Sequence, residues 1–152
     1  MAKITSLPQD LPILNQALAD LGALKQQVAA LENGLTMQPF DPKMTSGGGP
    51  YTNASARGYW TQLGSLVFIT LDMHFTTIGG GSSTIITLPK ACDTSAGNYV
   101  LSGVEIAVDG SAWIGQIGFA NNQSICVFRK YDGSGTPPTG ARIVATGFYP
   151  TL

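Results

Sequence analysis

The fold of this chain is decided by the stretch WTQLGSLVFITLDMHF, which covers residues 60–75. Two runs rich in apolar, β-branched and aromatic residues flank Gly64-Ser65, a pair suited to a type II′ hairpin turn. The second run alternates, so one face of a strand carries Ile69, Leu71, Met73 and Phe75, and the other face carries Thr70, Asp72 and His74. Leu66 and Phe68 add apolar side chains to this polar face. We therefore expect a hairpin with one face in the core and part of the other face covered by a neighbouring subunit.

Strand patterns continue outward from this hairpin to the C-terminus. Residues 83–88, 104–108, 111–114, 124–128 and 141–149 each have the composition of a short strand. Asp109-Gly110 is the strongest hairpin signal among the connections, and Asn121-Asn122 marks a further turn. About seven short strands with turns at regular spacing predict a small antiparallel β-sandwich or barrel over residues 51–152. The fold class is therefore mainly β.

The N-terminal residues follow a helical pattern instead. Apolar residues alternate at spacings of three and four, as in the a and d positions of a coiled coil: Leu14, Ala17, Leu21, Leu24, Val28, Leu31 and Leu35. Asp10 is suited to the N-cap, and Asn33-Gly34 is suited to the end of the helix. We expect a short parallel coiled coil of copies of this chain within residues 1–36; the alternative is a helix packed on its own β domain. The heptads do not decide between two and three strands.

Composition excludes several classes of function. Eight Lys and Arg against nine Asp and Glu give a net charge of -1, so the chain lacks the basic field that nucleic-acid binding needs. Charged residues are 11% of the chain and apolar residues 43%, a balance that favours burial between subunits. No apolar stretch has the length of a membrane helix, and no secretory signal precedes the coil, so we expect synthesis in a cytoplasm.

Two further features complete the organisation. Residues 37–50 contain X-Pro steps and the glycines at 47–49, so they are predicted to be a Pro/Gly linker. Cys92 and Cys126 match no metal-binding spacing, and we expect buried free thiols rather than a disulfide.

Residues that could carry out catalysis are few. His74 is the single histidine, and with Asp72 it falls short of the three or four ligands of a metal site. The glycine-rich segments 79–83 and 133–136 precede strand patterns rather than a helix N-terminus, so we interpret them as loops rather than phosphate sites. The acidic residues show no pairing typical of a glycosidase. We therefore expect no enzymatic activity, no cofactor and no metal.

A binding surface for saccharides is the interpretation that remains. Sugars stack their apolar faces on aromatic rings while polar side chains bind their hydroxyls. The densest such cluster is Arg129, Tyr131 and Asp132, just before a Gly/Pro-rich loop. Trp113 and the pair Asp72 and His74 are the second choice. For the tryptophan, a place in the core is the competing interpretation.

The plan of coil, linker and small β head resembles the receptor-binding proteins of phage tails, especially those of phages that infect lactic-acid bacteria. The resemblance covers about the last half of the chain and rests on GSAW at 110–113, SICVF at 124–128 and the ending 133–150. It implies a homotrimeric tail fibre or baseplate protein that is part of the virion. The N-terminus would join a tail or capsid protein, and the head would bind a host-surface saccharide, with no nucleic-acid partner and no membrane insertion.

An alternative from the same class of particle stays open. Heads of this family often present a His and an acidic residue after the tryptophan, where this chain has Gln116-Ile117-Gly118-Phe119. A phage structural, head-fibre or decoration protein would share the trimeric coil and head but lack a saccharide site. In either role we expect the copies to meet through Leu14, Leu21, Leu24, Val28, Leu31, Leu35, Leu66 and Phe68.

Overall fold

The computed structural model describes residues 10–34, 36–47, 49–51, 53–76, 83–118, 123–133 and 137–152. The chain divides into two compact units, Met1–Thr36 and Met37–Leu152, which we call the helical unit and the β unit. Several sequence predictions lie outside the described residues: Leu35 of the heptad pattern, Phe119, the turn at Asn121-Asn122, and the glycine-rich residues 79–82 and 134–136.

The described residues of the helical unit form the helix α1 (Asp10–Gly34), and its end at the predicted Asn33-Gly34 pair confirms that boundary. The heptad side chains that the structure describes are about half exposed in the single chain: Leu14, Leu21, Leu24, Val28 and Leu31. Ile13 and Leu18 are also exposed. Such an apolar stripe is typical of a helix that pairs with others, so self-association stays a prediction. Among the described residues, no helix combines the length and the hydrophobicity needed to cross a bilayer.

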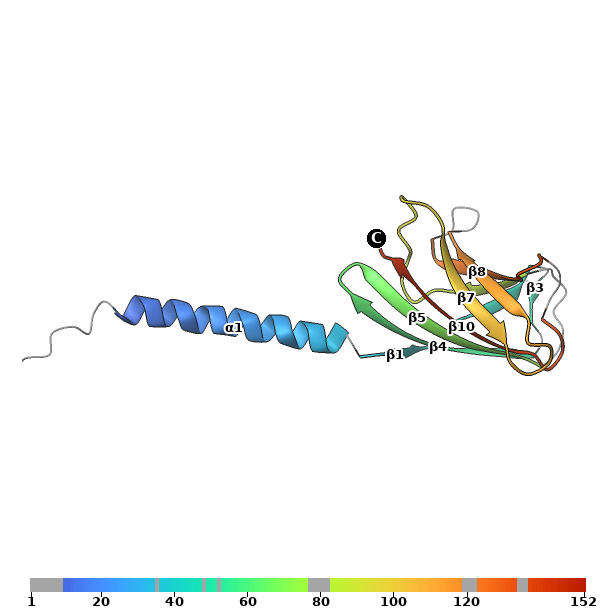
Figure 1. The fold of residues 1–152 in the computed structure, drawn as a ribbon, viewed down its shortest axis with the longest axis horizontal. Helices are drawn as coiled ribbons and strands as arrows, with labels where there is room; N and C mark the ends of the chain where they lie inside the picture. Colours follow the sequence, from blue (N-terminus) through green and yellow to red (C-terminus); the bar gives the residue numbers. More distant parts are fainter. Residues whose placement is uncertain are drawn as a thin grey trace, which may run out of the picture. The chain divides into compact units, whose positions relative to one another are not determined.

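The β unit is one curled antiparallel sheet (Figure 1). Its strands are β1 (Gln38–Phe40), β2 (Met44–Ser46), β3 (Gly49–Pro50), β4 (Ala54–Leu63), β5 (Leu66–Phe75), β6 (Thr84–Thr87), β7 (Tyr99–Glu105), β8 (Ala112–Ile117), β9 (Ile125–Lys130) and β10 (Arg142–Pro150). They pair in the order β1-β4-β5-β10-β7-β8-β9-β6-β2-β3. The mainly β class with an N-terminal helix is confirmed, as a half-barrel made by one sheet.

The hairpin of β4 and β5 follows the sequence prediction. Leu63 pairs with Leu66 across Gly64-Ser65, and Gly64 has φ +61°, which a side chain at this turn position would resist. Every second residue of β5 from Val67 to Phe75 is at most 1% exposed. These residues form the core together with buried side chains of the other strands, among them Trp113, Tyr149, Phe128, Ile143 and Leu101. We call the side of the sheet opposite this core the outer face.

Residues 37–50, predicted to be a linker, contain the strands at both edges of the sheet. β1 pairs with β4 and β2 pairs with β6, while β3 extends the sheet beyond β2. Pro39 and Pro50 are compatible with strands here because an edge strand leaves one side without a ladder of hydrogen bonds. The ring of Phe40 lies over Gly58, where a Cβ would approach it to 2.0 Å. The prediction of a linker did not include this contact of Phe40 with Gly58, which lies on the neighbouring strand.

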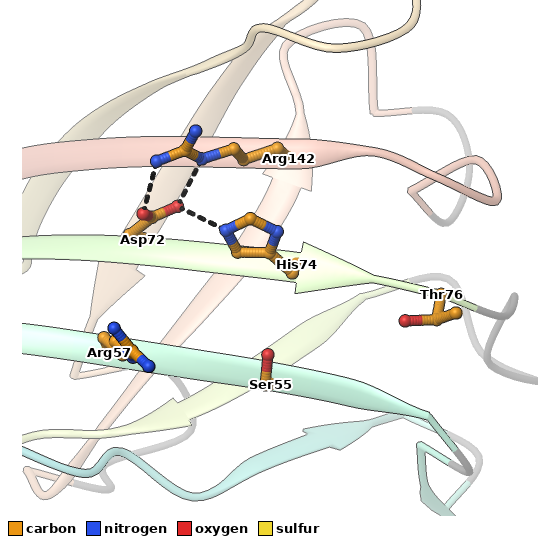
Figure 2. A pocket seen from close by; sticks show the side chains of 6 residues that line it. All are labelled: Ser55, Arg57, Asp72, His74, Thr76 and Arg142. Atoms are coloured by element: carbon orange, nitrogen blue, oxygen red, sulfur yellow. Dashed lines mark hydrogen bonds and ion pairs between the residues drawn. The ribbon is translucent and has the colours of Figure 1, made fainter.

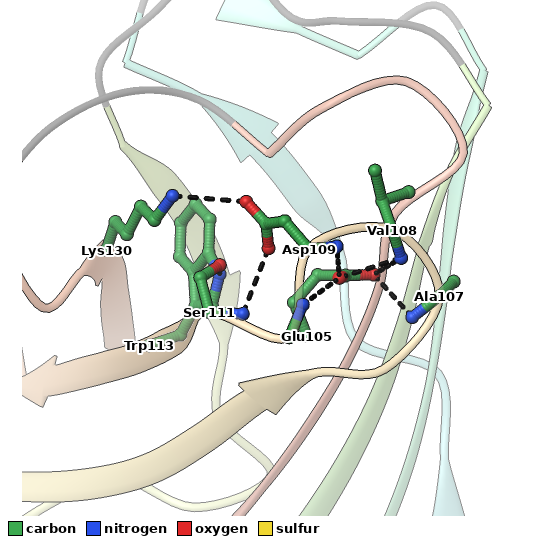
Figure 3. A network of polar contacts seen from close by, with 8 residues as sticks. Glu105, Ala107, Val108, Asp109, Ser111, Trp113 and Lys130 are labelled. Atoms are coloured by element: carbon green, nitrogen blue, oxygen red, sulfur yellow. Dashed lines mark hydrogen bonds and ion pairs between the residues drawn. The ribbon is translucent and has the colours of Figure 1, made fainter.

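The connection from β7 to β8 differs from the predicted two-residue turn at Asp109-Gly110. The strands end at Glu105 and restart at Ala112, and the six residues between them wrap around the buried Glu105 carboxylate (Figure 3). Its two oxygens accept hydrogen bonds from the backbone N–H groups of residues 107, 108, 109, 110 and 142 at 2.7–3.1 Å. A buried carboxylate stabilised by five N–H groups sets this loop.

Candidate functional site

A polar hollow of the outer face lies across β4, β5 and β10 (Figure 2). The antiparallel register places Ser55 and Arg142 on either side of His74, and Arg57 directly across from Asp72. These residues are far apart in sequence and become neighbours because β10 returns between β5 and β7. The hollow has a volume of about 490 Å³ and is lined by Ser55, Arg57, Asp72, His74, Thr76 and Arg142.

Asp72 is the centre of the polar contacts in this hollow. Arg142 donates two hydrogen bonds to it, from Nε to Oδ1 at 2.9 Å and from Nη2 to Oδ2 at 2.7 Å. His74 Nε2 lies 3.2 Å from Oδ1. The hydrogen bonds from Arg142 hold the pKa of the Asp72 carboxyl below its usual range, and the same contact raises the pKa of Arg142. Asp72 is therefore an anion that fixes the positions of a guanidinium and an imidazole.

Arg57 belongs to the same hollow but has a different environment. It pairs across the strands with Asp72, yet among the described residues no hydrogen bond or ion pair engages its guanidinium. Its side chain is exposed, and Figure 2 draws it without a contact to Asp72. With His74 counted as neutral, two arginines against one aspartate give the hollow a net charge of about +1. The hollow can therefore bind an anion or a hydroxylated ligand.

The hollow continues beyond the end of β5. A second hollow of about 320 Å³ shares His74 and Thr76 and reaches Thr139 and Gly140, before β10 begins. Ser55 and Thr76 thus line the first hollow, and Thr76 and Thr139 line the second. In the described part of the chain, no three His, Cys, Asp or Glu side chains gather as a metal site would require.

Trp113, a second-choice residue for the saccharide, lies in the core. Its side chain is 1% exposed and packs in the core. Its indole Nε1 donates a hydrogen bond to Ser111 Oγ at 3.0 Å, in the loop that Glu105 holds (Figure 3). The side chain of Trp113 points from β8 into the core, as the competing interpretation of this residue stated.

The first-choice residues Arg129, Tyr131 and Asp132 lie at the end of β9 and in the turn after it. All three are exposed, and Tyr131 is 75% exposed. Arg129 and Asp132 each have a polar or electrostatic partner. Strands β10, β7 and β8 separate β9 from β5 in the sheet, so this group and the Asp72 group are two separate surfaces.

The predicted subunit contacts on β5 form part of an uncharged patch. Phe68 is 41% exposed and faces Phe148, which is 55% exposed, with their ring centroids 5.9 Å apart. Leu66 is half-buried beside them. The uncharged patch consists of outer-face residues of four adjacent strands: Leu63, Leu66, Phe68, Thr70, Val100, Ser102, Val104, Val144, Thr146 and Phe148.

Sequence reasoning missed both arginines of the hollow. Arg57 was within reach, because a two-residue turn at Gly64-Ser65 fixes the register that places it across from Asp72. Arg142 was not, because no sequence signal says that the last strand pairs with β5. Comparisons of this chain with protein-family models, with curated proteins and with solved structures gave no match.

Proposed function

We propose that this protein is a homotrimeric attachment protein of a phage particle, which binds a host-surface saccharide without cleaving it. The observation that carries the proposal is the polar hollow, where Arg57, His74 and a fixed Arg142 lie among hydroxyl side chains on an exposed sheet surface. A ligand rich in hydroxyls requires polar side chains at defined positions that donate and accept hydrogen bonds. Ser55 lies across from His74, and Asp72 contacts that imidazole, but among the described residues no hydrogen bond joins the Ser55 hydroxyl to His74, so we propose binding rather than cleavage.

Self-association is supported by two apolar surfaces. The heptad stripe of α1 is exposed in the single chain, and a helix of 25 residues gains most of its stability from such packing. The uncharged patch around Phe68 and Phe148 matches the depletion of charge at the centre of protein interfaces. In the proposed trimer the N-terminal segment joins a tail or capsid protein, and the β units carry three copies of the hollow.

Three copies compensate for weak single sites. A shallow polar hollow gains little from apolar burial, so one site binds a sugar weakly. Simultaneous engagement of several sites raises the apparent affinity by about 10²–10⁴ when the spacing allows it. A repeating surface polymer offers many copies of the same sugar, so a particle that attaches to it can engage several sites at once.

The test is binding of the fluorescently labelled full chain to envelope polysaccharide fractions of lactic-acid bacteria. We expect binding by the wild type with no new reducing ends released, loss of binding in Arg57→Gln/His74→Gln, and retention in Arg129→Ala/Tyr131→Ala. Loss in the second variant alone would move the site to the end of β9. A wild type that binds no fraction would refute attachment and favour the structural, head-fibre or decoration role.

A further inference from the structure

We infer that the polar hollow selects a saccharide that carries an anionic group, a carboxylate or a phosphate. This inference rests on the proposed function and assigns the class of its ligand. It follows from which side chains line the hollow, which of them are already engaged by each other, and which remain available to a ligand.

The first argument is the composition of the lining. Apart from the His74 imidazole, none of the six lining side chains carries a ring on which a sugar could stack. A neutral sugar would therefore depend on hydrogen bonds at an exposed site, and each of these replaces a hydrogen bond to water. A carboxylate or a phosphate gains more, because it can pair with a guanidinium through two parallel charge-assisted hydrogen bonds.

The second argument is the distribution of charge. The Asp72 carboxylate, the only acidic group among the described lining residues, has both oxygens engaged by Arg142, and His74 lies against one of them. Its charge is thereby balanced within the site. Arg57 faces the same hollow with no partner recorded among the described residues. A planar guanidinium in this position presents paired N–H groups that match a carboxylate or a phosphate.

The third argument concerns the sugar itself. His74 Nε2 faces Asp72, so in the neutral ring the proton is on Nε2 and the other nitrogen, Nδ1, accepts hydrogen bonds. Figure 2 shows Nδ1 on the edge of the ring away from Asp72, towards Thr76. With the hydroxyls of Ser55 and Thr76, the hollow has an acceptor and two donors for sugar hydroxyls beside the cation. A free anion would use Arg57 alone.

His74 also provides the measurement, because it is the single histidine of the chain. In a tag-free protein at constant pH, its ring signals in an NMR spectrum report changes at this hollow without overlap from any other histidine. We would titrate full-length protein with trigalacturonate, with its methyl ester, with mannose 6-phosphate and with mannose. The two acidic probes test carboxylate and phosphate, and each has a neutral partner of the same sugar.

We expect both or one of the acidic probes to shift the His74 signals, with a Kd about tenfold below that of the neutral partner. Arg57→Gln should remove this tenfold preference, whereas Lys43→Gln, which removes an exposed cation elsewhere in the β unit, should preserve it. Added inorganic phosphate should compete only weakly, because it makes none of the sugar contacts.

Four results would contradict the inference, and they separate it from the proposed function. Equal shifts by acidic and neutral probes would leave a saccharide site without charge selection. Binding of the chain to envelope polysaccharide with no His74 shift by any probe would place the saccharide elsewhere. Absence of both kinds of binding would refute the proposed function together with the inference. A preference for the acidic probes that survives in Arg57→Gln would assign the selection to other groups.

Discussion

We expect Glu105→Gln to destabilise the β unit by about 2–4 kcal/mol at neutral pH, although the change is nearly isosteric. One oxygen of Glu105 accepts from Ala107, Val108 and Arg142, and the other accepts from Val108, Asp109 and Gly110. In the amide, an NH2 group replaces one of these oxygens, so two or three backbone N–H groups face a donor. Buried donors without an acceptor are the main cost of the substitution.

Glu105 should also make the free energy of unfolding of the wild type decrease as the pH is lowered. Burial by itself raises the pKa of Glu105, but hydrogen bonds from Ala107, Asp109, Val108 and Arg142 outweigh it and lower the pKa from 4.5 to about 2. A carboxyl with the lower pKa in the folded chain stabilises the fold above its unfolded pKa and loses this contribution as the pH falls. The difference between the two pKa values corresponds to about 3 kcal/mol in total. Because pH 3 is still above the pKa of the folded chain, we expect about 2 kcal/mol of this to be lost between pH 7 and pH 3.

Urea unfolding followed by tryptophan fluorescence measures both effects. Trp60 and Trp113 are the two tryptophans of the chain, and both lie in the β unit. The exposed Asp41 allows a matched control, Asp41→Asn, which we expect to change the free energy of unfolding by at most about 0.5 kcal/mol. Glu105→Gln should lose about 2 kcal/mol less than the wild type between the two pH values. A destabilisation no larger than that of the control, or an unchanged pH dependence, would refute this account of the loop.

Three other outcomes follow from the structure. Leu24→Gln/Val28→Gln should convert the proposed trimer of 15.9 kDa chains, about 48 kDa, into smaller species by light scattering while the tryptophan-detected unfolding stays unchanged; a monomeric wild type would contradict the coiled coil. Gly58→Ala should cost about 1–3 kcal/mol in the same unfolding assay, because its Cβ would meet an aromatic ring at 2.0 Å; no loss would mean that β1 does not pack there. Cys92 and Cys126 should react with a thiol reagent only on unfolding, because both are buried free thiols and burial raises the pKa of both; rapid reaction in the native chain would contradict this burial.

The parts of the fold that could be predicted are those set by local chemistry. The turn at Gly64-Ser65 needs a residue tolerant of positive φ, and the strand after it alternates strictly, so the hairpin and its buried face were predictable and are confirmed. The end of α1 at Asn33-Gly34 and the buried free thiols of Cys92 and Cys126 were predictable for similar reasons. Each depends on residues close in sequence or on the hydrophobicity of a single side chain.

The parts that could not be predicted depend on contacts distant in sequence. In the sequence, nothing distinguishes Glu105 from other acidic residues near turns. The fifth N–H group that it accepts comes from Arg142, on the last strand. The prolines of residues 37–50 suggest a linker until the pairing with β4 and β6 makes these segments sheet edges. The hollow requires the register of β10 on β5. A single sequence contains no record of which strands pair.

The position of β10 has a consequence for how the molecule is made. It follows every other strand in the chain, yet it lies inside the sheet, paired to β5 over nine residues and to β7 over four. Until β10 is synthesised, β1, β4 and β5 have no strand connecting them to the remaining six, and both groups expose an unpaired edge. Closure of the sheet is therefore the final step after synthesis of this region, and the pairing of distant segments makes it slow. A nascent chain that stops before residue 142 would be two incomplete sheets, open to pairing with the same edges of other chains.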